Sequence, residues 1–308
     1  MKTIFILGPT CVGKTEAAEK IALKINGEII NMDMGQLYAP ICIGTAKPLD
    51  WKKNPIKHHL FDLIHEPKDY SVVAYREKVV EALNNIHAKG ATAIFVGGSL
   101  FYLQSLLFGL RQEKEHIGNK EGIPKKDYTW ERLYEVDPER AKSIHPKDTY
   151  RIQRALTIWY KTGQKPSDQK PYWNPIVPSM SLLWLFREKQ DLQNRITSRT
   201  ELMSEQGWLQ EVALLPETWK EYVHKKRLCG YNIVVDAYNN NKKKLDDADK
   251  KQIVQNTMQY AKRQKAFWLY FKKKYLVNHT KQVLITEINL TFHSFDLYLE
   301  QIVLSKGL

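Results

Sequence analysis

Residues 8–15 read GPTCVGKT, and the spacing of Gly8, Gly13, Lys14 and Thr15 is that of a loop that binds a phosphate chain. Glycines let the backbone curl so that its N–H groups face anionic oxygens, and Lys14 adds a positive charge. The hydroxyl of Thr15 can serve as a ligand for Mg²⁺. The pattern therefore predicts a site for a diphosphate or triphosphate, but it does not identify the substrate, since kinases, NTPases and transferases all use such loops.

Two charged side chains follow the next apolar segment. Asp33 ends residues 27–33, and ligands of parallel sheets bind beyond the carboxyl ends of the strands. An ATPase usually has a carboxylate after a later strand, whereas residues 91–99 end in Gly-Gly-Ser. Three roles stay open for Asp33: outer metal ligand, general base, or cap of a helix. Lys47, in the following loop, is either a second contact for an anionic group or a solvated side chain.

Two segments combine basic and aromatic side chains, residues 150–161 and residues 259–274. Basic groups neutralise phosphates, and aromatic rings stack on unpaired bases. The helical period must turn some of these rings toward a core. We therefore expect nucleic-acid contacts first from the basic side chains, which are Arg151, Arg154, Lys262 and Arg263.

Hydrophobic periodicity predicts the elements that position these side chains. Strands are predicted at residues 2–7, 27–33, 91–99 and 180–186. Helices are predicted at residues 15–25, 70–90, 100–110, 189–206, 208–215 and 247–274, and the tail adds one more strand and helix. The alternation of strands and helices indicates an α/β fold with a parallel sheet flanked by helices, like that of the P-loop NTPases.

A helical segment is inserted into this alternation of strands and helices. Residues 111–128 have no apolar period and are predicted to be a linker. Two predicted helices follow, at 130–144 and 148–163, and a Pro-rich loop leads back to the sheet. The sequence therefore predicts a P-loop core, formed by residues 1–110 and 180–308 and including the C-terminal helices, and a helical insertion domain of residues 111–179.

The charge balance of the chain indicates a polyanionic partner. Its 308 residues carry a formal net charge of +13, which is typical of proteins that bind nucleic acid or an anionic surface, although a solvated basic surface is the alternative. The three cysteines form no C-x-x-C pair, so we expect neither a zinc site nor a disulfide framework. No segment approaches ~18 apolar residues, so we expect a cytoplasmic protein without a membrane span.

The motifs and their order resemble those of the tRNA dimethylallyltransferases, also called tRNA isopentenyltransferases. GPTCVGKT, DMGQLYAPICIGTAKP, HHLFDLI, VGGSLFYLQSLL and QYAKRQKAFW follow in the family's order over nearly the whole chain. The resemblance implies transfer of a dimethylallyl group from dimethylallyl diphosphate to N6 of an adenosine in tRNA, with release of pyrophosphate. The adenosine lies next to the anticodon, at position 37 of tRNAs that read codons starting with U. The implied partners are the tRNA anticodon stem-loop and dimethylallyl diphosphate, the implied cofactor is Mg²⁺, and the implied state is a monomer.

The resemblance also implies roles for individual residues. Asp33 would accept the N6 proton, and Thr10 would lie near the reacting carbon. Lys14 and Arg199 would bind the diphosphate, with Mg²⁺ on Thr15. The diphosphate-binding set is Gly8, Pro9, Thr10, Cys11, Val12, Gly13, Lys14 and Thr15. The tRNA-binding set is Asp33, Met34, Gly35, Gln36, Ser99, Tyr150, Arg151, Arg154, Arg227, Gly230, Tyr231, Lys262, Arg263 and Gln264.

The sequence departs from the family pattern near the predicted site. Met34 stands where the family usually has Ser, Cys42 stands where it usually has Asp, and GYNIV lacks the acid that often follows this segment. Three other activities stay open: a small-molecule kinase, a transferase acting on free AMP or ATP, and a non-catalytic RNA-binding protein. The first two leave the basic helix at 259–274 without a purpose, and the intact Lys14 and Asp33 argue against the third.

Overall fold

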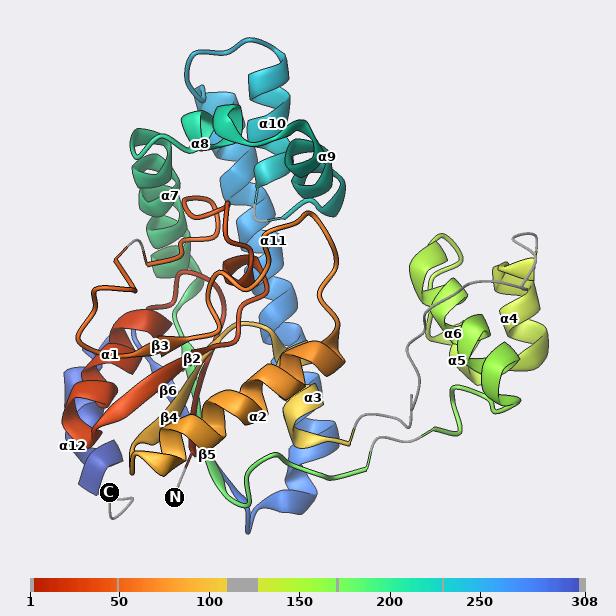
Figure 1. Ribbon diagram of the computed structural model, residues 1–308, viewed down its shortest axis with the longest axis horizontal. Helices are drawn as coiled ribbons and strands as arrows, with labels where there is room; N and C mark the ends of the chain where they lie inside the picture. The colour runs from red at the N-terminus through yellow and green to blue at the C-terminus, as the bar shows by residue number, and fades with distance from the viewer. Residues whose placement is uncertain (1–2, 49, 110–126, 170–171, 229, 305–308) are drawn as a thin grey trace. The chain divides into compact units, whose positions relative to one another are not determined.

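The computed structural model describes residues 3–48, 50–109, 127–169, 172–228 and 230–304 (Figure 1). The chain forms two compact units: Met1–Gln104 with Ile176–Leu308, and Ser105–Pro175. Most of the predicted linker at 111–128 lies outside the described residues. Among the residues that are described, no helix is long and apolar enough to cross a membrane.

The first unit contains all the described strands and most of the described helices. The strands are β1 (Thr3–Leu7), β2 (Gly27–Asn31), β3 (His58–His59), β4 (Thr92–Gly97), β5 (Met180–Phe186) and β6 (Val283–Asn289). The helices are α1 (Lys14–Ile25), α2 (Val72–Ala88), α7 (Lys189–Glu205), α8 (Trp208–Leu214), α9 (Glu217–Lys226), α10 (Tyr231–Asn239), α11 (Asp247–Phe271) and α12 (Asp296–Leu304). Helix α3 (Leu100–Leu107) includes residues of both units.

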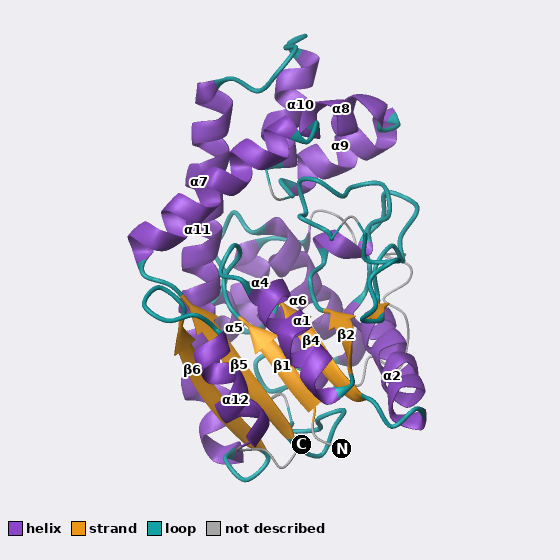
Figure 2. Ribbon diagram, turned by 90° about the vertical axis from the view of Figure 1, so that its left-hand side faces the viewer, coloured by secondary structure: helices purple, strands orange, loops and turns teal. Residues whose placement is uncertain are grey.

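The strands form one sheet in the order β3-β2-β4-β1-β5-β6, and every pair is parallel (Figure 2). The first strand is central, with Ile4 opposite Ile94 of β4 and Ser181 of β5. Since parallel strands end at one edge of the sheet, the segments that follow β1, β2, β4 and β5 are brought together there. This is the predicted α/β architecture.

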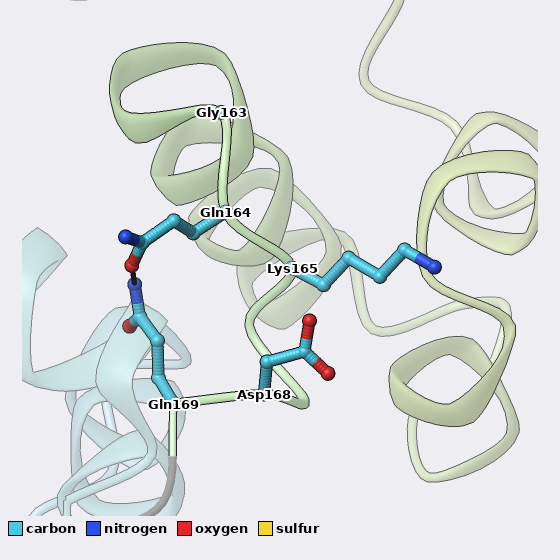
Figure 3. Close-up of a pocket in the computed structure, with 5 residues that line it drawn as sticks. All are labelled: Gly163, Gln164, Lys165, Asp168 and Gln169. Carbon is cyan, nitrogen blue, oxygen red and sulfur yellow. Dashed lines mark hydrogen bonds between the residues drawn. The ribbon is translucent and has the colours of Figure 1, made fainter.

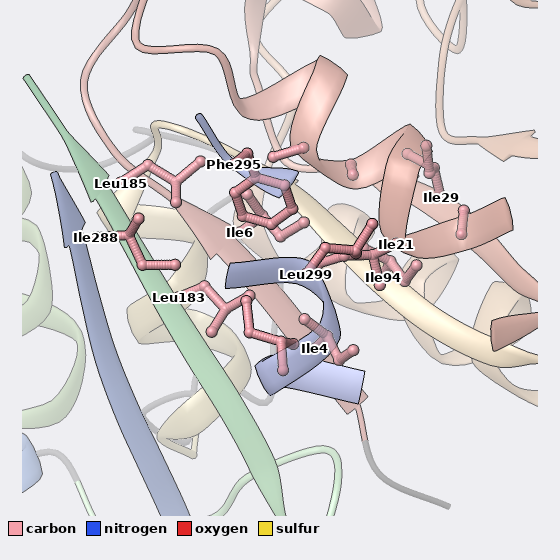
Figure 4. Packing of buried hydrophobic residues seen from close by; sticks show 14 of the residues in the cluster. Ile4, Ile6, Ile21, Ile29, Ile94, Leu183, Leu185, Ile288, Phe295 and Leu299 are labelled. Atoms are coloured by element: carbon pink, nitrogen blue, oxygen red, sulfur yellow. The ribbon is translucent and has the colours of Figure 1, made fainter. Parts of the chain in front are cut away.

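Alternate residues of β1 face opposite sides of the sheet. Ile4 and Ile6 belong to a buried cluster that also includes Ile21 of α1 and Leu299 of α12 (Figure 4). These two helices therefore cover one face of the sheet. The burial of such branched side chains stabilises the fold by roughly 1.5–3 kcal/mol for each.

The opposite face of the sheet is lined by aromatic rings. Phe5 of β1 stacks on Phe95 of β4, with ring centroids 4.4 Å apart. Trp184 of β5 stacks on Trp268 of α11, with centroids 4.7 Å apart and planes 3° from parallel. Helix α11 is therefore fixed to the sheet by the second half of its length, where the sequence AKRQKAFW lies.

The second unit contains α4 (Trp130–Val136), α5 (Pro138–Lys142) and α6 (Thr149–Thr162), packed around Leu133, Ile152 and Leu156. The prediction of a single helix at 130–144 was wrong. Asp137 interrupts it with φ −149°, because the residue before a proline is disfavoured in helical backbone. The Asp137 carboxylate instead accepts hydrogen bonds from the backbone N of Arg140 (3.0 Å) and of Ser167 (2.8 Å).

A shallow pocket lies in the loop after α6 (Figure 3). Its lining is Gly163, Gln164, Lys165, Asp168 and Gln169. The Gln169 amide donates to the Gln164 side-chain oxygen at 3.4 Å. None of these residues belongs to the predicted site, and the pocket is remote in sequence from the phosphate loop.

Candidate active site

The phosphate loop turns from β1 into α1, as the sequence predicts. Gly8 has φ +150°, and a Cβ there would lie 2.4 Å from the carbonyl oxygen of Leu185, so only glycine fits. Gly13 also has positive φ, +109°, immediately before α1 begins. The first turn of α1 therefore directs its unpaired N–H groups, with the positive end of the helix dipole, toward the loop. Thr15 is exposed at this helix terminus.

Lys14, Asp33 and Arg199 form a charge cluster at the loop. The Lys14 ammonium donates to the Pro9 carbonyl at 2.8 Å. Burial lowers the pKa of Lys14 to about 8; Asp33 opposes this shift and Arg199 adds to it. Burial also raises the pKa of Asp33, against the influence of Lys14, of the Gly35 N–H and of Arg199. A carboxylate with a raised pKa beside two cations is suited to accept a proton during a reaction.

The backbone around Asp33 is held by Asn31. The Asp33 N–H donates to Asn31 Oδ1 at 2.9 Å, and Asn31 Nδ2 donates to the carbonyls of Asp33 (3.1 Å) and Leu60 (2.9 Å). Asp33 Oδ1 accepts from the Gly35 N–H at 3.0 Å, at the start of a 3₁₀ turn, Gly35–Leu37. Asp33 is therefore a cap, but Oδ2 accepts no hydrogen bond from the described residues and is available to a substrate.

Three arginines from the segment around α7 bind the phosphate loop. Arg187 Nε donates to the Val12 carbonyl at 2.9 Å, and Arg195 Nε donates to the Cys11 carbonyl at 2.9 Å. Arg199 Nη1 lies 3.2 Å from Cys11 Sγ. Sequence reasoning identified only Arg199. Arg195 and Arg199 are four residues apart in RITSR, which places them on one helical face and could have indicated Arg195, whereas Arg187 precedes the helix and has no such signal.

Gln264 and Tyr231, both predicted to lie on tRNA-contacting stretches, are buried. Gln264 Oε1 accepts from the Thr10 N–H at 3.0 Å, and its Nε2 donates to the Gly98 carbonyl at 3.1 Å. It therefore joins the phosphate loop to the turn after β4. The Tyr231 hydroxyl donates to Glu211 at 2.6 Å. We assign both side chains to holding the site together and not to an RNA surface.

The remaining predicted tRNA residues occupy several places. Met34, Arg227, Lys262 and Arg263 are exposed in the first unit, whereas Gly35 and Gly230 are buried and Gln36 is partly buried. Ser99 accepts the Tyr102 N–H at 3.4 Å, at the start of α3. Tyr150, Arg151 and Arg154 are exposed on α6 of the second unit.

Lys47 fits neither role that the sequence left open. Its side chain is buried, with only 2% of its area exposed. Its ammonium forms an ion pair with Asp62 and donates to the Tyr38 carbonyl at 2.6 Å. Lys47 is therefore not solvated, and its ammonium is already paired within the protein, where it braces the loop that contains GTAKP.

Comparisons with known proteins identify the family of this chain. A family model described as IPP transferase matches residues 36–273. The tRNA dimethylallyltransferases of Bacillus cereus and Bacillus mycoides are 35% and 36% identical to this chain, over 275 and 276 residues, and each match covers 85% of both chains. The crystal structure of a eukaryotic dimethylallyltransferase acting on tRNA is similar, with a TM-score of 0.74 and 28% identity over 99% of this chain and 78% of that one.

A second solved structure shares the fold at lower identity. The tRNA isopentenylpyrophosphate transferase of Bacillus halodurans has a TM-score of 0.62 and 24% identity, covering 99% of this chain and 95% of that chain. The range that matches the family model includes Gln36, Arg199 and Gln264. The alignments with the curated relatives cover most of the length of those relatives. The chain therefore belongs to the IPP transferase family.

Proposed function

We propose that this protein transfers a dimethylallyl group from dimethylallyl diphosphate to N6 of an adenosine in tRNA. The observation that carries the proposal is the cluster of Asp33, Lys14 and Arg199 at the phosphate loop. It combines a proton acceptor with two cations at the place where parallel strands end. A reaction that needs both is one in which a nucleophile loses a proton while an anion departs.

The proposed step balances without an added oxidant or reductant. The N6 nitrogen forms a bond to C1 of the dimethylallyl group, and the bond from C1 to the diphosphate oxygen breaks with both electrons leaving on pyrophosphate. Asp33 Oδ2 accepts the N6 proton. Lys14, Arg199 and the N–H groups at the start of α1 stabilise the charge that develops on the departing oxygens, which is usually the largest catalytic contribution.

The residues present suit Mg²⁺ as a cofactor. Mg²⁺ prefers oxygen ligands and commonly takes one or two from the protein, with the rest from water and substrate phosphates. The Thr15 hydroxyl, exposed at the start of α1, is such an oxygen. When bound, the ion would neutralise charge on the diphosphate. Among the described residues, no group of three or more His, Cys, Asp or Glu could hold a metal without substrate.

The acceptor we propose is the anticodon stem-loop of tRNAs that read codons starting with U, with the adenosine next to the anticodon as the target. The net charge of +13 and the exposed Lys262 and Arg263 support a polyanionic partner. A base must leave its stack to bring N6 to the phosphate loop. We expect the protein to act as a monomer.

Incubation with radiolabelled dimethylallyl diphosphate and bulk tRNA, followed by nucleoside analysis, tests the proposal. We expect the label on N6-dimethylallyladenosine and one pyrophosphate released for each transfer. Parallel reactions with AMP and with ATP distinguish the alternatives. Label on free AMP or ATP would indicate a nucleotide prenyltransferase, and ATP hydrolysis without prenylated tRNA would indicate a kinase or NTPase.

A further inference from the structure

We propose that Glu211 is a positioning residue for this reaction. Its carboxylate, on α8, fixes the loop at residues 42–46, and this loop in turn supports the turn that carries Asp33. The catalytic part of this inference rests on the proposed function, because it takes Asp33 as the group that accepts the proton. Sequence reasoning gave Glu211 no role.

The Glu211 carboxylate binds consecutive backbone N–H groups of the loop. Its Oε2 accepts from the N–H of Cys42 at 2.7 Å and from that of Ile43 at 2.8 Å. Its Oε1 accepts from the Tyr231 hydroxyl at 2.6 Å, and this hydroxyl accepts from the Gly44 N–H at 3.1 Å. One side chain therefore determines, directly or through Tyr231, the orientation of three successive peptide groups.

The same loop lies directly against the Asp33 turn. Gln36 Nε2 donates to the carbonyls of Thr45 and Ala46, each at 3.2 Å. The fit around Gly35 is close, since a Cβ there would lie 3.0 Å from Thr45 Cγ2 and 3.4 Å from Asp33 Oδ1. A shift of the loop must therefore move the peptide whose N–H binds Asp33.

Helix α8 also contacts the loop by direct packing. A Cβ on Gly44 would lie 2.4 Å from atoms of the Trp208 ring, so the backbone of the loop rests on this indole. Trp208 begins α8 and lies one turn before Glu211. The ring limits how near the loop can come to the helix, and the carboxylate prevents it from moving away. Together they define one position for the loop.

The test compares Glu211→Ala and Glu211→Gln with the matched control Glu217→Ala, which removes an exposed carboxylate of neighbouring α9 whose one ion-pair partner among the described residues is Lys220. We expect Glu211→Ala to lower kcat for prenyl transfer by roughly 10–100-fold, the loss typical of a small misplacement of reacting groups. The KM for dimethylallyl diphosphate should change by less than about twofold, because the phosphate loop is untouched. Glu211→Gln keeps one acceptor oxygen and should recover most of kcat.

Amide hydrogen exchange provides a second measurement that does not depend on activity. In Glu211→Ala, the N–H groups of Cys42, Ile43 and Gly44 should exchange at least about tenfold faster, and those of β1 should not. Should Glu211→Ala fail to fold, Tyr231→Phe removes the hydroxyl that joins Glu211 to the Gly44 N–H but leaves the bonds of Glu211 to Cys42 and Ile43, and it should give a smaller change of the same kind.

The possible outcomes distinguish failure of the positioning role of Glu211 from failure of the proposed prenyl transfer. Unchanged exchange at these three amides, or an unchanged kcat, would overturn the positioning role. Equal losses in kcat and in diphosphate affinity would also overturn it, since they would indicate general disruption. Wild-type protein without prenyl transfer would overturn the proposed function and with it the effect of Glu211 on the reaction, while faster exchange in the variant would still establish that Glu211 holds the loop.

Discussion

The two carboxylate oxygens of Asp33 have different environments. Oδ1 caps the Gly35 N–H, and Oδ2 accepts no hydrogen bond from the described residues. Asp33→Asn keeps an oxygen for the cap but cannot take a proton at the second position. We therefore expect kcat to fall by about 10²–10⁴-fold, as for loss of a general base. Single-turnover kinetics measure this fall, and filter binding should show tRNA affinity within about twofold of wild type. Activity within a few-fold would mean that Asp33 is only a cap.

The lowered pKa of Lys14 predicts that binding of dimethylallyl diphosphate weakens at alkaline pH. Its pKa of about 8 means that the ammonium loses its charge as pH rises through that value. The kcat/KM for dimethylallyl diphosphate should then fall on the alkaline side of about pH 8. Lys14→Arg, which stays charged, should flatten this alkaline limb even if its absolute rate is lower. A limb unchanged in Lys14→Arg would assign it to another group.

The lowered pKa of Lys14 also makes the stability of the fold depend on pH. In the unfolded chain the pKa of Lys14 returns toward 10.5, so between about pH 8 and 10.5 the unfolded state binds more protons than the folded state. The contribution of Lys14 to the free energy of unfolding therefore becomes more favourable as pH rises through this window. Urea unfolding of Lys14→Met should lack this increase.

Among the elements, α11 has two functions along one helix. Gln264 faces inward and joins Thr10 to Gly98, whereas Lys262 and Arg263 are exposed. Gln264→Ala should loosen the phosphate loop and raise the Kd for dimethylallyl diphosphate by about tenfold, the loss of one to two hydrogen bonds. Isothermal titration calorimetry measures this Kd in wild type and variant. Gln252→Ala, an exposed residue of the same type and helix, serves as the control and should have no effect.

Arg187 connects three segments at the other side of the phosphate loop. Besides Val12, its guanidinium binds the Leu290 carbonyl at 2.7 Å and Asp191 at 2.8 Å. Arg187→Met would remove this donor from the carbonyls of the buried residues Val12 and Leu290, and we expect the free energy of unfolding to fall by about 2–3 kcal/mol. Urea unfolding of Arg187→Met and of the exposed Arg195→Met gives the comparison. Equal losses in the two variants would contradict the role assigned to Arg187.

The elements also show what the sequence could predict. Strand β5 has the predicted bounds, because MSLLWLF is a continuous apolar run that must be buried. Helices α9 and α10 were not predicted, and their contacts with the loop after Asp33 could not be inferred. Arg187 and Arg195 were missed because their partners are backbone carbonyls distant in the chain. Gln264 and Tyr231 were expected to contact tRNA from the family resemblance, and their burial against the phosphate loop and against Glu211 depends on tertiary packing that the sequence does not show.

For the whole molecule, charge is the property that should govern tRNA affinity. The double variant Lys262→Ala with Arg263→Ala removes two exposed cations from α11. If both contact phosphates, the slope of log K against log salt should become shallower by about 1–2. Filter binding from low to high salt measures the slope, with Gln252→Ala as the neutral control. An unchanged slope would locate the RNA surface elsewhere, with the exposed Arg151 and Arg154 of α6 as the alternative contacts.

The stacked pair of Trp184 and Trp268 has an optical consequence. Two indoles stacked in nearly parallel planes with centroids 4.7 Å apart couple their electronic transitions, and where the transition moments are skewed this coupling gives an exciton couplet in circular dichroism. One ring belongs to the central sheet and the other to the helix that supports the phosphate loop. The couplet is therefore an intrinsic reporter of their docking, requires no attached dye, and would distinguish loosening of α11 from unfolding of the whole chain.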